Sequence, residues 1–222
     1  MRLDANVALN RAEGPAWASR GGAKLAGALD DFGLDPVGLV CLDAGASTGG
    51  FTDVLLARAA RRVYAVDVGR GQLLARLAND PRVVVMDRTN LRTLDALPEP
   101  VDLATLDLSF ISLRLVLPSV RRLLAPDGAV VALVKPQFEA GRADVPRGGV
   151  IRDSAVHRRV LTGIREGAAA AGLKAVDLVA ASAAGRDGNR EFLVLLRPMD
   201  ETDGSTLAVE AAWDTKVESA LS

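Results

Sequence analysis

Residues 42–53 read LDAGASTGGFTD, a glycine-rich stretch with apolar sequence on both sides. Before it, residues 39–42 form the short apolar run that is typical of a buried parallel strand. After it, Phe51, Val54 and Leu55 repeat at helical spacing. The stretch therefore predicts a strand, a turn and a helix. Because glycines let a backbone pass close to a ligand, and a helix N-terminus has free N–H groups, we expect a nucleotide-type cofactor at this turn.

The spacing of the glycines separates two kinds of cofactor. A dinucleotide-binding turn has the pattern GxGxxG, but Ser47 stands in place of the middle glycine, and the acidic Asp43 precedes the turn. An acidic residue followed by small residues suits S-adenosylmethionine, whose amino-acid end has a cationic amine and a sulfonium and no phosphate. The alternative is an α/β turn that binds no cofactor.

The next two predicted strands also end in carboxylates. Asp67 closes the apolar run 63–67, where it is placed to accept both hydroxyls of an adenosine ribose, and Asp87 closes the run 83–87. The candidate cofactor-binding residues are Asp43, Gly45, Ala46, Ser47, Gly49, Gly50, Phe51, Asp67, Val68 and Asp87.

Strands and helices alternate along the chain, without internal repeats. Further strands are predicted at 101–107, 129–134, 174–182 and 192–197, and helices at 19–32, 51–56, 116–124 and 154–171, with a turn at 126–128. This order predicts an α/β fold with a doubly wound, mostly parallel seven-stranded sheet and an antiparallel last strand. Ligands of such sheets bind beyond the carboxyl ends of the strands, where Asp67, Asp107 and Lys135 fall.

Composition excludes several classes of protein. The 222 residues have a net charge of −1 and only 4% aromatic residues, which argues against nucleic-acid binding through global charge or extended aromatic platforms. Apolar runs such as 129–134 are far shorter than the ~20 residues of a membrane span. The single cysteine, Cys41, suits core packing, and the single histidine, His157, suits a surface position and cannot build a metal cluster. We expect no metal and a location in the reducing cytoplasm.

Basic side chains are concentrated in two places. Arg20 and Lys24 lie in the first turns of a predicted helix, where the helix dipole disfavours cations. This placement indicates an anionic ligand or a carboxylate partner, although a solvated basic turn fits as well. The glycine-rich loop 141–152 contains Arg142 and Arg147, which suit contacts with an RNA backbone or a lid; a plain surface loop is the alternative.

Seven motifs in order carry a resemblance to a known family: SRGGAKL at 19–25, LDAGASTGGFTDVLL at 42–56, AVDVGRGQL at 65–73, DRTN at 87–90, DLSFISL at 107–113, VKPQFEAGR at 134–142 and GNREF at 188–192. They resemble the TlyA family, often labelled haemolysin A, and within it the FtsJ-type methyltransferase domain. The resemblance implies a Rossmann-like class I methyltransferase that uses S-adenosylmethionine to methylate the 2′-hydroxyl of cytidines in small- or large-subunit ribosomal RNA. Its partners would be ribosomal RNA or ribosomal subunits.

The resemblance also implies a set of catalytic residues. FtsJ-like enzymes carry a Lys, Asp, Lys, Glu tetrad, which the motifs match to Lys24, Asp107, Lys135 and Glu191. A ribose hydroxyl is a weak nucleophile, so a base within hydrogen-bond reach accelerates its attack on a methyl group. Lys135 is the candidate for that base.

Members of this family usually begin with a small RNA-binding domain. We therefore expect residues 1–18 to be a remnant of that domain or a linker, with residues 1–12 as its last strand. Residues 19–198 would form the methyltransferase domain, and residues 199–222 a tail with a short helix. Three other readings stay open: a pore-forming haemolysin, an NAD-linked oxidoreductase, and a non-catalytic module that binds cofactor or RNA.

Overall fold

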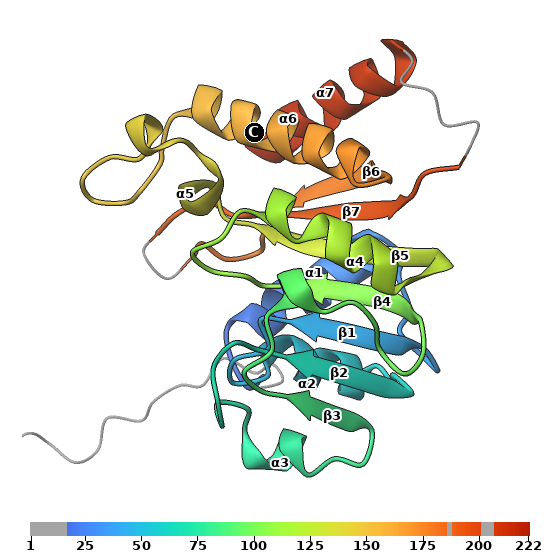
Figure 1. The fold of residues 1–222 in the computed structure, drawn as a ribbon. Coiled ribbons are helices and arrows are strands. Elements are labelled where there is room, and N and C mark those ends of the chain that lie inside the picture. Colours follow the sequence, from blue (N-terminus) through green and yellow to red (C-terminus); the bar gives the residue numbers. More distant parts are fainter. Residues whose placement is uncertain (1–16, 186–187, 201–206) are drawn as a thin grey trace, which may run out of the picture.

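One seven-stranded sheet organises the chain (Figure 1). The computed structural model describes residues 17–185, 188–200 and 207–222, so the strand expected within residues 1–12 lies outside the described residues. The strands are β1 (Val40–Ala44), β2 (Arg62–Val66), β3 (Val83–Met86), β4 (Val101–Leu106), β5 (Leu124–Val134), β6 (Leu173–Ala180) and β7 (Phe192–Pro198), in the order β3-β2-β1-β4-β5-β7-β6.

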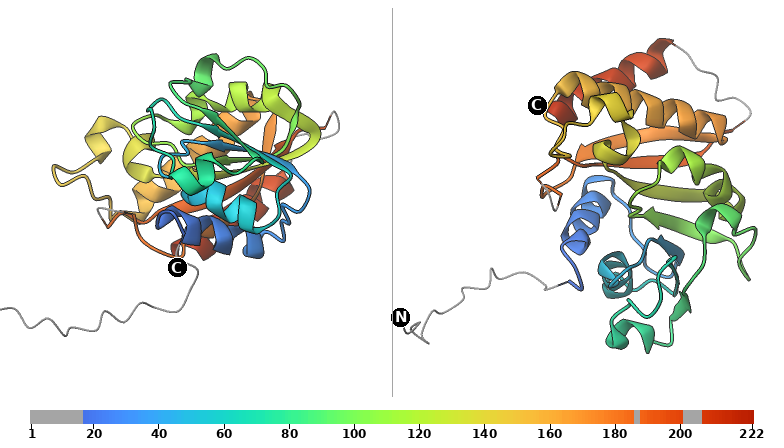
Figure 2. Two further views of the ribbon diagram at one scale, coloured as in Figure 1. Left: turned by 90° about the horizontal axis from the view of Figure 1, so that it is seen from below. Right: turned by 60° about the vertical axis from the view of Figure 1, so that its left-hand side comes forward.

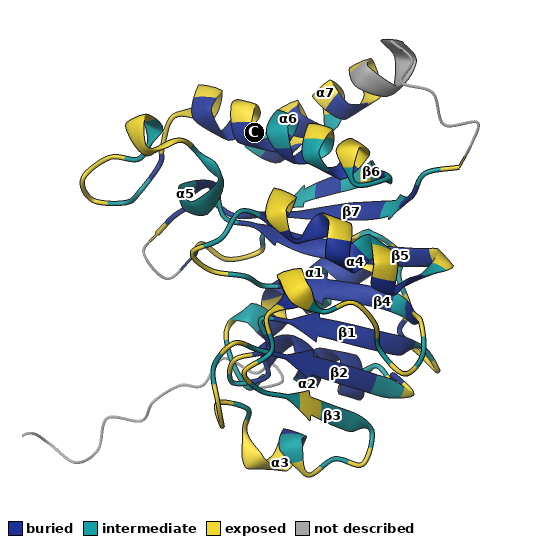
Figure 3. Cartoon of the chain, in the orientation of Figure 1, coloured by how far each residue is buried: buried dark blue, intermediate teal, exposed yellow. Residues whose placement is uncertain are grey.

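The direction of the strands confirms the predicted fold class. Strands β1 to β5 pair in parallel, whereas β7 runs antiparallel to both β5 and β6. All five residues of β1 are buried, as expected for the apolar run 39–42 in the middle of a sheet that is covered on both faces. Figure 3 shows that burial is deepest in the central strands and decreases toward β3 at the edge.

Helices cover both faces of this sheet (Figure 2). The α-helices are α1 (Gly21–Asp31), α2 (Gly50–Ala57), α3 (Ala75–Ala78), α4 (Leu117–Leu123), α5 (Pro136–Glu139), α6 (Ser154–Ala170) and α7 (Leu207–Leu221), and the 3-10 turns are η1 (Leu91–Thr93), η2 (Leu113–Leu115) and η3 (Arg142–Asp144). One hydrophobic cluster joins the sheet to α1 and α2, and a second joins it to α4, α6 and α7.

Local signals placed several helix ends correctly. The side chain of Asp153 accepts a hydrogen bond from Ala155 N at 2.8 Å and so caps α6, which stops before Gly172 at φ +74°. Helix α1 likewise ends just before Gly33, which has φ +62°. The tail contains α7, where Trp213 and Val217 are buried against the main core.

Two expectations were wrong. Strand β5 begins at Leu124 and runs through the turn predicted at 126–128, because its pairing with β4 continues past a register shift between Val101 and Leu103. His157 is not on the surface: only 3% of it is exposed, and its ring packs edge-on against Phe192 with the centroids 5.6 Å apart. Burial lowers the pKa of His157.

Cys41 is fully buried in β1, as predicted for a core residue. Burial, and to a smaller extent the nearby carboxylates Asp102 and Asp43, raise the pKa of its thiol to about 12. The thiol therefore stays protonated and unreactive, which fits a packing role.

Candidate active site

The turn after β1 brings two strand ends into contact. Gly45 has φ +84°, and a Cβ on this residue would stand 2.5 Å from the carbonyl oxygen of Asp107, the residue after β4. Gly45 N and Ala46 N both donate to the carbonyl of Val66 at the end of β2, at 2.8 and 3.2 Å. Only glycine fits the first position of this turn, and the fit holds the ends of β1, β2 and β4 together.

A cavity of about 460 Å³ lies beyond these strand ends. Among the residues that line it are Gly45, Ser47, Asp67, Val68, Asp107 and Phe110. The first four are predicted cofactor-binding residues. The cavity is therefore where a ligand of a doubly wound sheet is expected, at the carboxyl edge.

The carboxylate of Asp67 accepts hydrogen bonds from the backbone and still has acceptor positions that a ligand could use. Its Oδ2 accepts from Ser47 N at 2.8 Å and its Oδ1 accepts from Gly69 N at 2.7 Å. A carboxylate has about four acceptor positions, so two remain for hydroxyl groups. Asp87, also a predicted cofactor-binding residue, anchors a loop: its Oδ2 accepts from Gly71 N at 2.7 Å, which ties the loop after β2 to the end of β3.

Asp43 lies behind the turn and is completely buried. Its Oδ2 accepts from the N–H and the hydroxyl of Thr52 at 2.8 and 2.6 Å, which anchors α2, while its Oδ1 has no hydrogen-bond partner. Burial raises the pKa of Asp43 to about 7, and the charges of Asp107 and Asp67 add to this rise. At neutral pH Asp43 is therefore only partly ionised, and together with Asp67 and Asp107 it gives this end of the sheet a negative field that suits a cationic ligand.

The other predicted residues of the turn pack against protein. A Cβ on Gly49 would collide with Leu77, and a Cβ on Gly50 would collide with Ser19. Phe51 of α2 is 2% exposed and belongs to the hydrophobic core, and Ala46 is also buried. These residues shape the turn from behind and do not line the cavity.

The residues matched to the tetrad form two ion pairs. Lys24 Nζ of α1 lies 2.5 Å from Glu191 Oε2, just before β7, and the two side chains are 8% and 4% exposed. Lys135 Nζ lies 2.7 Å from Asp107 Oδ1 and donates to Ser109 Oγ at 2.9 Å. Lys24 thus has the carboxylate partner that its unfavourable place in the helix dipole indicated.

The sheet brings the two pairs to one edge. Val134 pairs with Phe192 in the β5–β7 ladder, so Lys135 and Glu191 occupy the next positions of adjacent strands. A Cβ on Gly21, in the first turn of α1, would stand 3.2 Å from Asp107 Oδ2, so the start of α1 lies against the second pair.

The predicted RNA-binding residues Arg20, Arg142 and Arg147 are exposed. Arg20 stands at the start of α1, and the other two lie on the 141–152 loop that follows α5. Sequence reasoning missed Phe110, which is 90% exposed, has φ +63° and stacks at a tilt on Phe138 with the centroids 4.9 Å apart. Because only 4% of the residues are aromatic, we did not expect an aromatic contact with RNA, although Phe110 lies within the DLSF motif.

In the described part of the chain, no group of three or more His, Cys, Asp or Glu side chains is arranged to bind a metal ion. Over the same residues, no helix has both the length and the apolar character that a membrane crossing needs.

Comparisons with known proteins agree with this geometry. Residues 17–198 match the family described as FtsJ-like methyltransferase. The chain is 47% identical over 199 residues to the 16S/23S rRNA (cytidine-2'-O)-methyltransferase TlyA of Mycobacterium tuberculosis, covering 89% of this chain and 74% of that protein. It is 39% identical over 183 residues to Hemolysin A of Brachyspira hyodysenteriae, covering 80% and 75%. A solved structure from Streptococcus thermophilus is 40% identical with a TM-score of 0.86, covering 95% of this chain and 76% of that one.

Proposed function

Because this chain belongs to the FtsJ-like methyltransferase family, we propose that it transfers a methyl group from S-adenosylmethionine to the 2′-hydroxyl of a cytidine in ribosomal RNA. The resemblance read from the sequence motifs is confirmed by the family match and by the TlyA relative at 47% identity. The observation that carries the proposal is the ion pair of Lys135 with Asp107, because Asp107 lines the cavity beyond β1 and β4 and the Lys24–Glu191 pair lies at the same edge of the sheet.

The residues around the cavity fit the cofactor. The unused acceptor positions of Asp67 suit the two ribose hydroxyls, and the negative field of Asp43, Asp67 and Asp107 suits a sulfonium cation. Asp43 Oδ1, buried without a partner, adds to that field. When bound, the cofactor supplies an electrophilic methyl group.

We assign the proton transfer to Lys135. Asp107 and Ser109 hold its amino group in place, and a neutral Nζ would accept the proton of the 2′-hydroxyl as the oxygen attacks the methyl carbon. Lys24 and Glu191, the second ion pair at this edge of the sheet, would orient the ribose. Fixed geometry of this kind contributes to the rate because the reacting atoms are aligned before the reaction.

The RNA would approach from the side where Phe110 is exposed. Its ring packs on Phe138, whose centroid lies 6.0 Å from Lys135 Nζ, and its exposed surface is available to an unstacked base. Arg20, Arg142 and Arg147 supply positive charge for the phosphates of the same strand. We place this activity in the cytoplasm, on ribosomal subunits.

The decisive experiment is transfer of tritiated methyl groups to ribosomal subunits and to free ribosomal RNA, with mapping of the labelled nucleotide. Label at the 2′-oxygen of a cytidine, lost in Lys135→Ala, supports the proposal. Label on a base, or none on any RNA, refutes it. Liposome leakage by the pure protein tests the pore-forming reading, and titration with NADH tests the oxidoreductase reading.

A further inference from the structure

Residues 107–113, which follow β4, and residues 135–139, which follow β5, contact each other at three places. At the first, Lys135 contacts Asp107 and Ser109; at the second, the rings of Phe138 and Phe110 stack. At the third, the carboxylate of Glu139 bonds to the far end of the 107–113 segment. The first two contacts belong to the site already described, whereas the third has no assigned role.

Glu139 is the last residue of α5, and both of its oxygens are engaged. Oε1 accepts from Leu113 N at 2.7 Å, and Oε2 accepts from the hydroxyl of Ser112 at 2.6 Å. Ser112 is in turn the N-cap of η2. The carboxylate therefore fixes the point where the loop after β4 ends and regular structure begins again. Burial raises the pKa of Glu139, and these two bonds and the charge of Arg114 oppose that rise.

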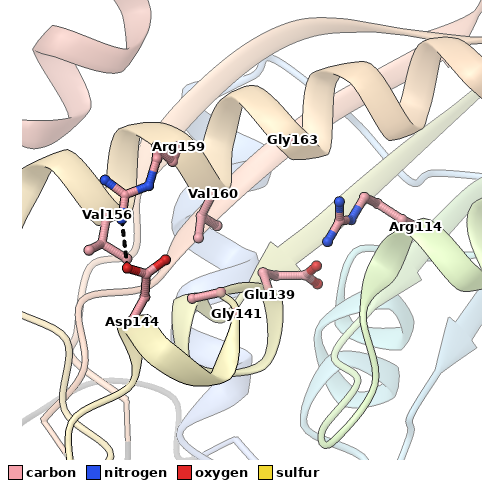
Figure 4. Close-up of a pocket in the computed structure, with 9 residues that line it drawn as sticks. Arg114, Glu139, Gly141, Asp144, Val156, Arg159, Val160 and Gly163 are labelled. Atoms are coloured by element: carbon pink, nitrogen blue, oxygen red, sulfur yellow. Dashed lines mark hydrogen bonds and ion pairs between the residues drawn. The ribbon is translucent and has the colours of Figure 1, made fainter.

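On its other side Glu139 faces a cavity of about 160 Å³ between α5, η3 and α6 (Figure 4). Arg114 points toward the carboxylate from η2, and across the cavity Arg159 of α6 forms an ion pair with Asp144 at 2.8 Å. The hydrogen bonds that orient the carboxylate come from Ser112 and Leu113, and the charge of Arg114 lies near it. Glu139 thus acts as a link between two segments more than as a filler of the core.

The 107–113 loop requires fixing at both of its ends. It carries Ser109, which holds the amino group of Lys135, and Phe110, which is 90% exposed and has φ +63°. An aromatic residue at positive φ is disfavoured and persists only where its surroundings fix it. At one end the loop is fixed by Asp107 N donating to Ala44 O at 2.9 Å, and at the other end by Glu139.

We propose that Glu139 is a positioning residue for methyl transfer, which fixes the 107–113 loop so that Ser109 and Phe110 stand correctly against Lys135 and the incoming nucleotide. This inference rests on the proposed function. It requires the reach and the acceptor atoms of the side chain, and its negative charge is secondary.

Four variants separate these requirements. Glu139→Ala loses both bonds and should lower kcat by about 10- to 100-fold, the range expected when reacting groups move by up to an ångström. Glu139→Asp keeps the charge but is one methylene shorter, so it should fail similarly. Glu139→Gln keeps an acceptor for Leu113 N and can donate to Ser112 Oγ, so it should stay within about threefold of wild type. Asp144→Ala, on the same cavity but without contact to the loop, should leave kcat unchanged.

Two readouts do not depend on turnover alone. The dissociation constant for S-adenosylmethionine should change by less than kcat in Glu139→Ala and Glu139→Asp, because Asp67 and the 45–47 turn keep their contacts and only the loop side of the cavity moves. Amide exchange at Leu113 should accelerate at least tenfold in Glu139→Ala, because its acceptor is gone, and should not change in Asp144→Ala. If Glu139→Ala does not fold, Ser112→Ala, which removes one of the two bonds, should give a smaller loss of kcat, between two- and tenfold.

Unchanged kcat in folded Glu139→Ala, or loss in Glu139→Gln equal to that in Glu139→Ala, would overturn the inference. If the wild-type protein labels no RNA, the proposed function fails and the catalytic role of Glu139 fails with it. The exchange rate at Leu113 then still decides whether Glu139 holds the loop.

Discussion

The buried pair of Lys24 and Glu191 makes a prediction about stability that is separate from catalysis. The two side chains are 8% and 4% exposed and meet at 2.5 Å, so each neutralises a charge that water cannot reach. Lys24→Met removes the cation and leaves Glu191 without its ion-pair partner. Breaking a buried pair in this way costs about 3 to 5 kcal/mol. For a domain of this size, 1 kcal/mol shifts Tm by roughly 2 to 4 °C, so we expect a loss of roughly 6 to 20 °C.

A double variant tests the origin of this loss. Removing both charges, in Lys24→Met with Glu191→Met, avoids the uncompensated carboxylate and should recover most of the stability, because apolar residues of similar volume often replace a buried pair at little cost. The enzyme should nevertheless stay inactive, since both side chains belong to the proposed site. Stability is measured by urea unfolding at pH 7, and activity by methyl transfer to ribosomal subunits.

A more exposed pair, which joins α1 to the end of α2, provides the control. Arg58 and Asp30 meet at 2.7 Å near the other end of α1, with side chains 34% and 63% exposed. Arg58→Met should cost less than about 1 kcal/mol, and that cost should fall at high salt, whereas the cost of Lys24→Met should persist. If Lys24→Met costs no more than Arg58→Met, or if the double variant is no more stable than the single one, the pair is not the buried, mutually dependent unit described above.

Three further outcomes are expected. Lys135→Ala should leave cofactor binding within a few-fold and reduce methyl transfer by about 10² to 10⁴, and Lys135→Arg should be nearly as poor because arginine stays protonated; near-normal transfer by Lys135→Arg would disprove the proton-accepting role. Asp67→Ala removes acceptors worth about 1.5 to 3 kcal/mol each, so calorimetry should show at least a tenfold loss of S-adenosylmethionine affinity, and unchanged affinity would remove the assignment. Burial raises the pKa of Asp43 to about 7, and a bound cation lowers that pKa, so binding of S-adenosylmethionine should release a proton. The affinity for S-adenosylmethionine should therefore rise from pH 6 to pH 8, and Asp43→Asn should flatten this pH dependence.

Local sequence patterns predicted the elements of the fold but not the separate roles of the glycines. Gly45 touches the end of β4 and lines the cavity, whereas Gly49 and Gly50 are needed for packing against Leu77 and Ser19. Neither contact is visible in the motif itself, because the partners come from other elements. His157 was misplaced for the same reason: its neighbour Phe192 lies on β7, far along the chain.

The pairing within the tetrad could not be predicted from local sequence patterns either. Lys24 and Glu191 are 167 residues apart, and no periodicity in the sequence connects them. The placement of Lys24 against the helix dipole did indicate a carboxylate partner, but only the resemblance pointed to Glu191. Phe110 was missed because the exposure of a single aromatic residue, here between Ser109 and Ile111, cannot be predicted from the sequence.

The reversed direction of β7 explains how Glu191 reaches the site at all. The residues that follow β1, β4 and β5 lie close together because these parallel strands all end at the same edge of the sheet. Glu191 precedes its strand, and in a parallel strand that position would lie at the opposite edge. Because β7 is antiparallel, Phe192 at its beginning pairs with Val134 at the end of β5, and Glu191 arrives beside Lys135. The one antiparallel strand of this sheet is thus what allows a residue at a strand's beginning to join the candidate active site.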